Sequence, residues 1–332
     1  MRPMLTALGL ITLAMPLLAG PLVADPLPSW NESASKAAIV EFVAAVTDPA
    51  SPDYVPQAER IAVFDNDGTL WAEQPVYFQL FYALDRLRQK AEADPSILTS
   101  DALRAAAAGD LGAVMAGGVP ALIEVVMASH ADITAAEFEA DVAQWVNSAT
   151  HPTTGLTYAQ MVYQPMTELL RYLRDEGFST WIVSGGGQHF VRALAEDAYG
   201  IPPEQVVGTM GETEYRVIDG VGQIYKLPDV EFIDDKGGKP LGIDRNIGRR
   251  PIMAFGNSDG DYEMLEYVTT GEGPGLGVIL HHTDGEREWA YDRESHIGSL
   301  NRGLDDAAAQ GWVLIDMAAD WEVVFAATAA GD

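Results

Sequence analysis

Short apolar runs alternate with longer amphipathic segments over much of this chain. Runs of that length that are apolar at every position predict strands buried on both faces, and the amphipathic segments predict helices. Gly177 and Gly200 follow two of these segments, where glycine is typical of a helix end. The expected strands lie at 61–64, 179–184, 251–255 and 276–280; helices are expected at 166–177, 188–200 and 261–268, and near Lys239. A closing strand and helix are expected between Trp312 and Phe325. This alternation predicts a three-layer α/β fold with a mostly parallel, Rossmann-like sheet.

Two segments interrupt the alternation. Residues 74–165 are rich in Ala and Leu and show hardly any strand pattern, with breaks at Asp94-Pro95, Gly117-Gly118 and His151-Pro152. We therefore expect an inserted, all-α cap at 74–165 and a core domain made of 25–73 and 166–332. Residues 215–218 and 223–227 flank Asp219-Gly220, which predicts a β-hairpin.

The first 24 residues predict an export signal peptide. They contain Arg2, no acidic residue and an apolar run from Leu5 to Ala24, and small residues such as Ala24 offer a cleavage point. The alternative is an uncleaved membrane anchor, since the run is nearly long enough to span a bilayer. The chain has no cysteine, which excludes both disulfides and a lipid on an N-terminal cysteine. We expect an exported, periplasmic protein that stays off the membrane after signal cleavage.

The hydrophobic content and the net charge limit the kinds of partner that the chain can bind. The 332 residues are 48% hydrophobic and 21% charged, which is typical of a folded protein. The formal net charge of -29 argues against a nucleic-acid partner and against docking on anionic lipid. Neither number indicates the oligomeric state.

The segment VFDNDGTL at 63–70 carries the most specific chemistry. An apolar strand ends there, and Asn66, Asp67 and Gly68 tolerate a tight turn. Asp65 and Asp67 should therefore emerge together at the carboxyl edge of the sheet, where open α/β folds bind ligands. A plain Asn-Asp-Gly turn is the alternative.

Three later segments add complementary groups. Ser184 precedes three glycines and a helix, an arrangement that can hold an anion. Lys236 and Lys239 stand in a Gly-rich entry to a helix, and Asn257 and Asp261 follow another strand. Each segment alone could be an ordinary loop, a solvated loop or a helix cap. Together they supply a nucleophile, an acid, a cation and oxygen ligands for one phosphoryl-transfer site.

The order Asp-x-Asp-Gly-Thr, strand-Ser, Lys and Gly-Asn-x-x-x-Asp resembles the haloacid dehalogenase superfamily, phosphatase branch, over nearly the whole mature chain. The helical insertion resembles the cap of the phosphoserine phosphatase group. The resemblance implies that Asp65 attacks phosphorus and that Asp67 protonates the leaving group and then activates water. It also implies that Ser184 holds a phosphate oxygen and that Lys239, or Lys236 in its place, balances the charge. From their position after Ser184, Gly185 and Gln188 are further candidates to bind substrate, and a helix-cap or surface role is the alternative for Gln188.

The resemblance further implies a Mg²⁺ site. Its ligands would be the Asp65 carboxylate, the Asp67 backbone carbonyl and Asn257, with Asp261 steadying that shell. Many relatives have an acid where Asn257 stands, so one negative charge is missing, and Asp259 is a candidate to supply it.

The resemblance implies a Mg²⁺-dependent phosphomonoester hydrolase that acts on a small phosphate ester through an aspartyl phosphate. Relatives that act on phosphoserine tend to carry an acid nine positions beyond the nucleophile. Here Gln74 stands at that position, after Glu73, which argues against phosphoserine. A binding protein without catalysis and a phosphotransferase to an alcohol are the alternatives. His281 and His282 look like a metal pair, but adjacent strand residues point to opposite faces.

Overall fold

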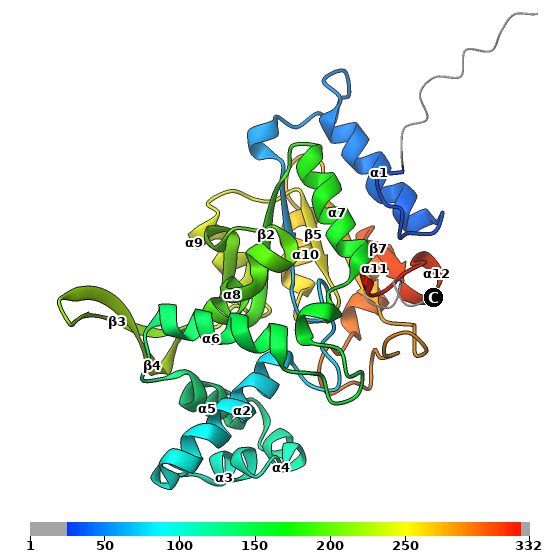
Figure 1. The fold of residues 1–332 in the computed structure, drawn as a ribbon. Helices are drawn as coiled ribbons and strands as arrows, with labels where there is room; N and C mark the ends of the chain where they lie inside the picture. Colours follow the sequence, from blue (N-terminus) through cyan, green and yellow to red (C-terminus); the bar gives the residue numbers. More distant parts are fainter. Residues whose placement is uncertain (1–24, 327–332) are drawn as a thin grey trace, which may run out of the picture.

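The computed structural model describes residues 25–326 (Figure 1). The expected export signal at 1–24 lies outside the described residues. Within 25–326, every helix is too short or too polar to cross a bilayer.

A mostly parallel sheet organises the core, as expected. In the described part of the chain its seven strands lie in the order β4-β3-β2-β1-β5-β6-β7. Strand β1 is central and pairs in parallel with β2 and β5, while β3 and β4 are antiparallel. The strands are β1 (Ile61–Phe64), β2 (Ser179–Gly187), β3 (Val206–Ile218), β4 (Val221–Phe232), β5 (Met253–Gly256), β6 (Leu276–His281) and β7 (Val313–Asp316).

Helices cover both faces of this sheet (Figure 1). Phe64 points to the face covered by α1 (Ala34–Thr47), α7 (Gln164–Asp175) and α8 (Gln188–Tyr199). Val63 points to the opposite face, covered by α9 (Gly238–Asn246) and α10 (Tyr262–Thr269). Because β1 is buried on both faces, its side chains are all apolar and do not alternate with polar ones. Polar residues appear only after its last residue. The α-helix α11 spans Arg302–Gln310, and short 3₁₀ helices lie at 57–59, 95–97, 158–161 and 203–205.

The inserted segment forms a helical layer below the core in Figure 1. It has an apolar core of its own, which includes Leu84, Leu103 and Val125. Thr134 begins the last of its α-helices with a reciprocal capping box to Glu137. The α-helices are α2 (Phe78–Ala93), α3 (Asp101–Ala107), α4 (Leu111–Ala116), α5 (Gly118–His130) and α6 (Ala135–Ser148).

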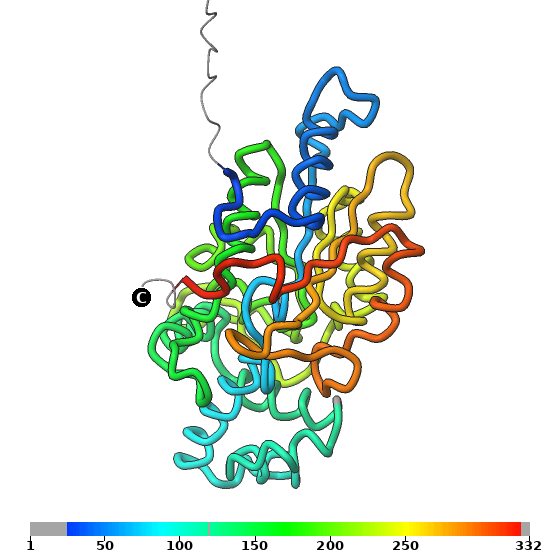
Figure 2. The backbone as a smooth tube through the Cα atoms, turned by 90° about the vertical axis from the view of Figure 1, so that its right-hand side faces the viewer, coloured from blue at the N-terminus to red at the C-terminus, as the bar shows by residue number. Residues whose placement is uncertain are grey.

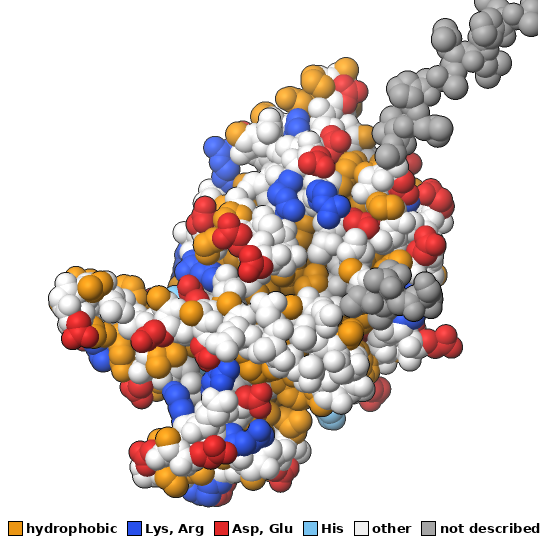
Figure 3. All heavy atoms as spheres, in the orientation of Figure 1, with side chains coloured by type: hydrophobic (Ala, Val, Ile, Leu, Met, Phe, Trp, Pro, Cys, Tyr) orange, Lys and Arg blue, Asp and Glu red, His pale blue; other side chains and the backbone are white. Residues whose placement is uncertain are grey.

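The β3–β4 hairpin is longer than the sequence predicted. It turns at Asp219 and Gly220, both with positive φ, as expected. Its strands, however, extend well beyond 215–218 and 223–227 and project from the sheet as an arm with apolar side chains on its surface (Figure 3). The arm also touches the cap, because the Lys226 backbone N–H donates to the Ile133 carbonyl at 2.9 Å. The cap therefore rests on a β-ribbon that belongs to the core sheet.

The first and last described segments lie side by side (Figure 2). The Trp30 and Trp321 rings are 5.9 Å apart, and the Asn31 N–H donates to the Asp320 carbonyl at 2.8 Å. The closing helix α12 (Met317–Asp320) is a single turn, shorter than expected. Beyond it, Trp321 and Phe325 pack on Tyr163.

Candidate active site

The loop after β1 is held in one conformation by its own backbone. The Asn66 carbonyl accepts hydrogen bonds from the N–H groups of Thr69 and Leu70. Gly68 has φ +75°, and a Cβ there would lie 2.0 Å from Asn257 Nδ2. Glycine is thus required both by the backbone conformation and by the close approach of Asn257.

Asp67 is half-buried, and its two oxygens have different surroundings. Trp71 Nε1 donates to its Oδ1 at 2.8 Å. Its Oδ2 faces the glycine loop, since a Cβ on Gly186 would lie 3.3 Å from that oxygen. Desolvation in the enclosed site raises the pKa of Asp67 to about 6, against the opposing effects of Trp71 and Lys239. A carboxyl group with that pKa can both donate and accept a proton near neutral pH.

Lys239 links the nucleophile candidate Asp65 to Asp261 in the loop after β5. Its buried Nζ donates to Asp65 Oδ1 at 2.5 Å, to Asp261 Oδ1 at 2.6 Å and to the Val183 carbonyl at 2.8 Å. Lys236 is exposed, and its backbone N–H bonds the Gly260 carbonyl. The structure therefore places Lys239, and not Lys236, at the site.

The charges of this cluster shift each other's protonation. Burial alone would lower the pKa of Lys239, but the negative charges of Asp261 and Asp65 outweigh it and raise that pKa. Burial, followed by the charge of Asp261, raises the pKa of Asp65, although Lys239 acts in the opposite direction. The Lys239 ammonium group thus pairs with two buried carboxyl groups, Asp65 and Asp261, so acidic groups outnumber basic ones in this cluster.

The end of β2 supplies a glycine loop. Ser184 is fully buried, and its Oγ accepts a hydrogen bond from the Gly186 N–H at 3.0 Å. The Gly187 N–H donates at 2.8 Å to Oε1 of Gln79, a residue of cap helix α2 that the sequence did not single out. Gln79 Nε2 in turn lies 3.0 Å from His130 Nε2. A cap side chain thus reaches the loop where the phosphate oxygens are expected.

The structure places the three expected substrate-binding residues differently. Gly185 lines the cavity of the site, and the Ser184 side chain lies beneath the glycine loop. Gln188 lies outside the residues that line the cavity. Its amide oxygen, in the orientation that satisfies its neighbours, accepts hydrogen bonds from Arg192 of the same helix. Gln79 occupies the position between cap and glycine loop instead.

Asp261 holds the loop after β5 with both carboxylate oxygens. Its Oδ2 accepts from the N–H groups of Asn257 and Ser258 at 3.0 and 3.1 Å, and its Oδ1 accepts from Lys239. This geometry fits a steadying role better than direct ligation. Asp259 does not supply the charge that Asn257 lacks, because its carboxylate accepts from backbone N–H groups at the start of α11, such as that of Gly303 at 2.9 Å.

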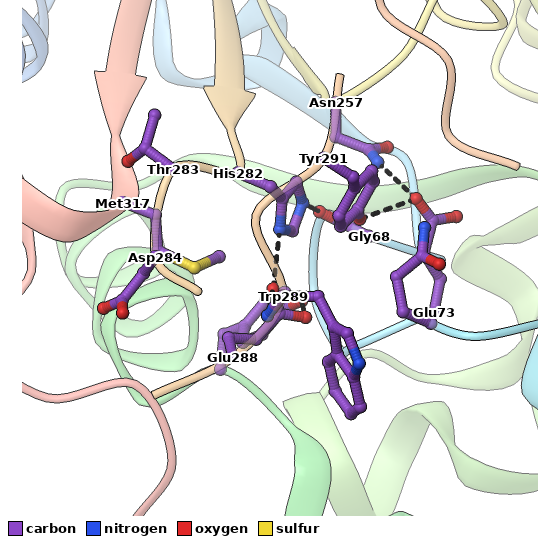
Figure 4. Close-up of polar contacts among 12 residues, drawn as sticks. Gly68, Glu73, Asn257, His282, Thr283, Asp284, Glu288, Trp289, Tyr291 and Met317 are labelled. Atoms are coloured by element: carbon purple, nitrogen blue, oxygen red, sulfur yellow. Dashed lines mark hydrogen bonds and ion pairs between the residues drawn. The ribbon is translucent and has the colours of Figure 1, made fainter. Parts of the chain in front are cut away.

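Glu73 fixes the Asn257 amide (Figure 4). Its Oε1 accepts from Asn257 Nδ2 at 2.8 Å and from the Tyr291 hydroxyl at 2.7 Å. Asn257 Oδ1 therefore faces away from Glu73 and toward the Thr69 hydroxyl, 3.3 Å away. Glu73 is buried, and that burial, with the nearby charges of Asp67 and Asp65, raises its pKa despite these hydrogen bonds. Glu73 thus supplies a carboxylate in hydrogen-bond contact with Asn257, at the position where many relatives have an acid.

A buried histidine clamps the turn from the other side (Figure 4). His282 Nε2 lies 2.7 Å from the Gly68 carbonyl, and Nδ1 lies 3.1 Å from Glu288 Oε2. Glu288 also accepts from the Tyr163 hydroxyl at 2.8 Å and from the Trp289 N–H at 2.7 Å. Both ring nitrogens thus face oxygen atoms, and the ring links the Gly68 turn to Glu288. His281 makes a separate contact with Asp292.

The donor set fits a hard divalent cation. Within residues 25–326, no three acidic or histidine side chains form a metal-binding group. A site at this edge would combine the free Asp65 oxygen and Asn257 Oδ1 with the Asp67 backbone carbonyl, all of them oxygen ligands of the kind that Mg²⁺ prefers. The excess negative charge around Lys239 favours a cation in the same place.

A cavity of about 310 Å³ opens above these groups. Asp65, Asp67, Lys239 and the three glycines of the loop after Ser184 line its core end, and cap helices line the other end. The four strand ends that the sequence singled out therefore converge on one cavity.

The chain belongs to the haloacid dehalogenase-like hydrolase family, since residues 62–266 match the model of that family. This match covers more than half of the chain and confirms the superfamily that the sequence motifs indicated. No curated protein matches the chain.

The chain is similar to several solved structures at low sequence identity. A conserved functionally unknown protein from Anaerococcus prevotii is 18% identical, with a TM-score of 0.51 over 78% of this chain and 88% of its own. A protein with unknown function from Bordetella pertussis is 18% identical, with a TM-score of 0.48 over 78% and 99% of the two chains. A phosphoserine phosphohydrolase-like protein from Francisella tularensis, also 18% identical, has a TM-score of 0.39 over 75% and 98%.

Proposed function

We propose that this chain is a Mg²⁺-dependent phosphomonoester hydrolase that works through an aspartyl phosphate. The ion pair between Lys239 and Asp65 carries the proposal, because it places a charge-balanced carboxylate beside Asp67 at the end of one cavity. The apolar leader at 1–24 supports export of the protein to the periplasm.

In the first step, an Asp65 carboxylate oxygen attacks phosphorus and forms a new P–O bond. The bond from phosphorus to the ester oxygen breaks, and Asp67 gives its proton to the departing alkoxide. Trp71 holds one Asp67 oxygen, so the other is left to face the ester oxygen. The ammonium group of Lys239 offsets the charge on the phosphoryl oxygens.

In the second step, Asp67 takes a proton from water, and the water oxygen attacks phosphorus. The bond between phosphorus and Asp65 breaks, which returns the free carboxylate and releases inorganic phosphate. Lys239, whose Nζ lies 2.5 Å from Asp65 Oδ1 in the structure, balances that carboxylate. Mg²⁺, held by Asp65, Asn257 and the Asp67 carbonyl, would neutralise charge on the phosphoryl group.

A trapping experiment tests this proposal. Residues 25–332 are assayed with a panel of phosphate monoesters, with and without Mg²⁺, and then crystallised with beryllofluoride. We expect phosphate release that chelation of Mg²⁺ abolishes and an adduct on Asp65. An adduct on a different side chain, or turnover indifferent to the divalent cation, contradicts the proposal.

Swapping the carboxylate and the amide between positions 73 and 257 should show why position 257 is an amide. Asn257→Asp places two carboxylates at the 2.8 Å contact, so we expect a lower melting temperature in the absence of metal. Adding Glu73→Gln should restore most of that loss, because one carboxylate and one amide again face each other.

Tyr291→Phe is the matched control, since it removes one hydrogen bond to Glu73 and no charge. If the metal-free double variant melts no higher than Asn257→Asp alone, the two side chains are independent and this account of position 257 is wrong.

A further inference from the structure

The two ends of the active-site cavity have opposite chemistry. The charged side chains that line it, such as Asp65, Asp67 and Lys239, lie at the core end. The cap segment contributes mostly apolar side chains, and none of its lining residues is charged. The apolar set includes Leu80, Met115, Leu122, Ile123, Val126 and Met127.

The β-hairpin arm continues this apolar wall from the core side. Val230 near the end of β4 and Ile233 just after it line the same cavity. Met127 of α5 approaches the arm closely, since its Sδ would lie 3.8 Å from a Cβ on Gly211 of β3. The apolar wall is thus built from two separate parts of the chain, which together enclose the space opposite the phosphoryl site.

The polar cap residues in the wall offer little to a charged or polyhydroxylated substrate. Gln79 uses both ends of its amide, one on the Gly187 N–H and the other on His130. Tyr77 adds a neutral phenol. Lys239 is the one cation that lines the cavity within residues 25–326, and Asp65 and Asp261 hold it.

Given the proposed phosphatase activity, we propose that the substrate is a phosphate monoester of an apolar, uncharged alcohol or phenol of about benzyl size. A carboxylate or a second phosphate on the leaving group would be buried without a positive partner. An ammonium group would lie against the apolar wall, away from the carboxylates at the core end. A sugar would leave its hydroxyl groups without hydrogen-bond partners. Burial of an apolar ring against this wall is favourable in proportion to its area.

Three benzyl esters of matched shape test the charge preference. The wild-type protein is assayed with benzyl phosphate, para-carboxybenzyl phosphate and para-(aminomethyl)benzyl phosphate, whose leaving groups differ mainly in charge. We expect kcat/KM for benzyl phosphate to exceed that for either charged ester by about thirtyfold or more. Glucose phosphate should be a poor substrate as well. Equal values for the three benzyl esters, or a preference for a charged one or for the sugar, overturn the proposal.

Met127→Lys provides a gain-of-function arm. Lysine is close to methionine in size and shape and places a cation in the wall. Para-carboxybenzyl phosphate should therefore become a better substrate than benzyl phosphate. Ala113→Lys adds the same charge at an exposed position of the neighbouring helix α4 and is the matched control. It should keep the wild-type order, and an equal change in both variants would contradict the assignment of the wall.

The outcomes separate this proposal from the more general one. If para-carboxybenzyl phosphate is hydrolysed as well as benzyl phosphate, the phosphatase proposal stands and the apolar substrate class falls. If none of the esters is hydrolysed and beryllofluoride does not modify Asp65, the phosphatase activity itself is rejected.

Discussion

Asp65→Asn should reduce phosphate release from benzyl phosphate by about 10⁴-fold or more, because the amide cannot form the covalent intermediate. The substitution keeps the shape of the side chain and an oxygen that can accept from Lys239. The fold should survive, since Asp65 is buried beside another carboxylate, Asp261, and loss of one charge relieves that contact. We therefore expect a melting temperature no lower than that of the wild type.

Steady-state kinetics and calorimetry on the same sample check this expectation. Asp259→Asn is a matched control, because its carboxylate contacts the start of α11 and lies outside the cavity lining. It should keep nearly wild-type turnover. Full activity in Asp65→Asn would contradict the covalent mechanism, and a large loss in the Asp259 variant would show that the substitution acts through the fold.

Asp67→Asn should have an effect that depends on the leaving group. With benzyl phosphate, turnover should fall by about 10²–10⁴-fold, because the alkoxide finds no proton donor. With para-nitrophenyl phosphate, whose leaving group needs no proton, the first step should survive and the second should stall. Stopped-flow absorbance should then show a burst of about one nitrophenolate per active site. Continuous turnover of this ester at the wild-type rate would rule out Asp67 as the base of the second step.

The pKa of Asp67 also sets the sign of a pH effect. With a pKa raised to about 6, Asp67 is protonated below that pH and loses its proton above it. Because the first step needs the protonated form, kcat/KM for benzyl phosphate should fall as pH rises above about 6. The value for para-nitrophenyl phosphate should not show this decline, and a parallel decline for both esters would assign the titration to another group.

The sheet was predictable because its strands are short and apolar on both faces. Val63 and Phe64 pack on opposite layers, so β1 is apolar at every position and Asp65 is the first polar residue after it. The length of the β3–β4 arm was not predictable. Its strands are exposed over much of their length and include polar residues such as Glu212 and Glu214, so the pattern of a buried strand is missing.

Part of the site was predictable because Asp65 and Asn257 directly follow strands, whose carboxyl ends converge at one edge of the sheet. Lys239 lies within α9, beyond the end of β4 at Phe232, and its Gly-rich surroundings marked it in the sequence. Glu73 was not predictable, since its partner Asn257 lies 184 residues away and the family spacing points to Gln74. The His281-His282 pair was visible in the sequence, but the role of His282 was not predictable, because its partner Gly68 lies on a different loop.

The pairing of Asn31 with Asp320 implies that the order of segments along the polypeptide can be changed without disturbing the hydrolytic centre. A circular permutant that joins the two outer segments by a short linker could begin and end at the Asp219-Gly220 turn, where a Cβ on Gly220 would meet no atom within 4 Å. The positions at which the chain begins and ends are then set by the gene and are not required for catalysis.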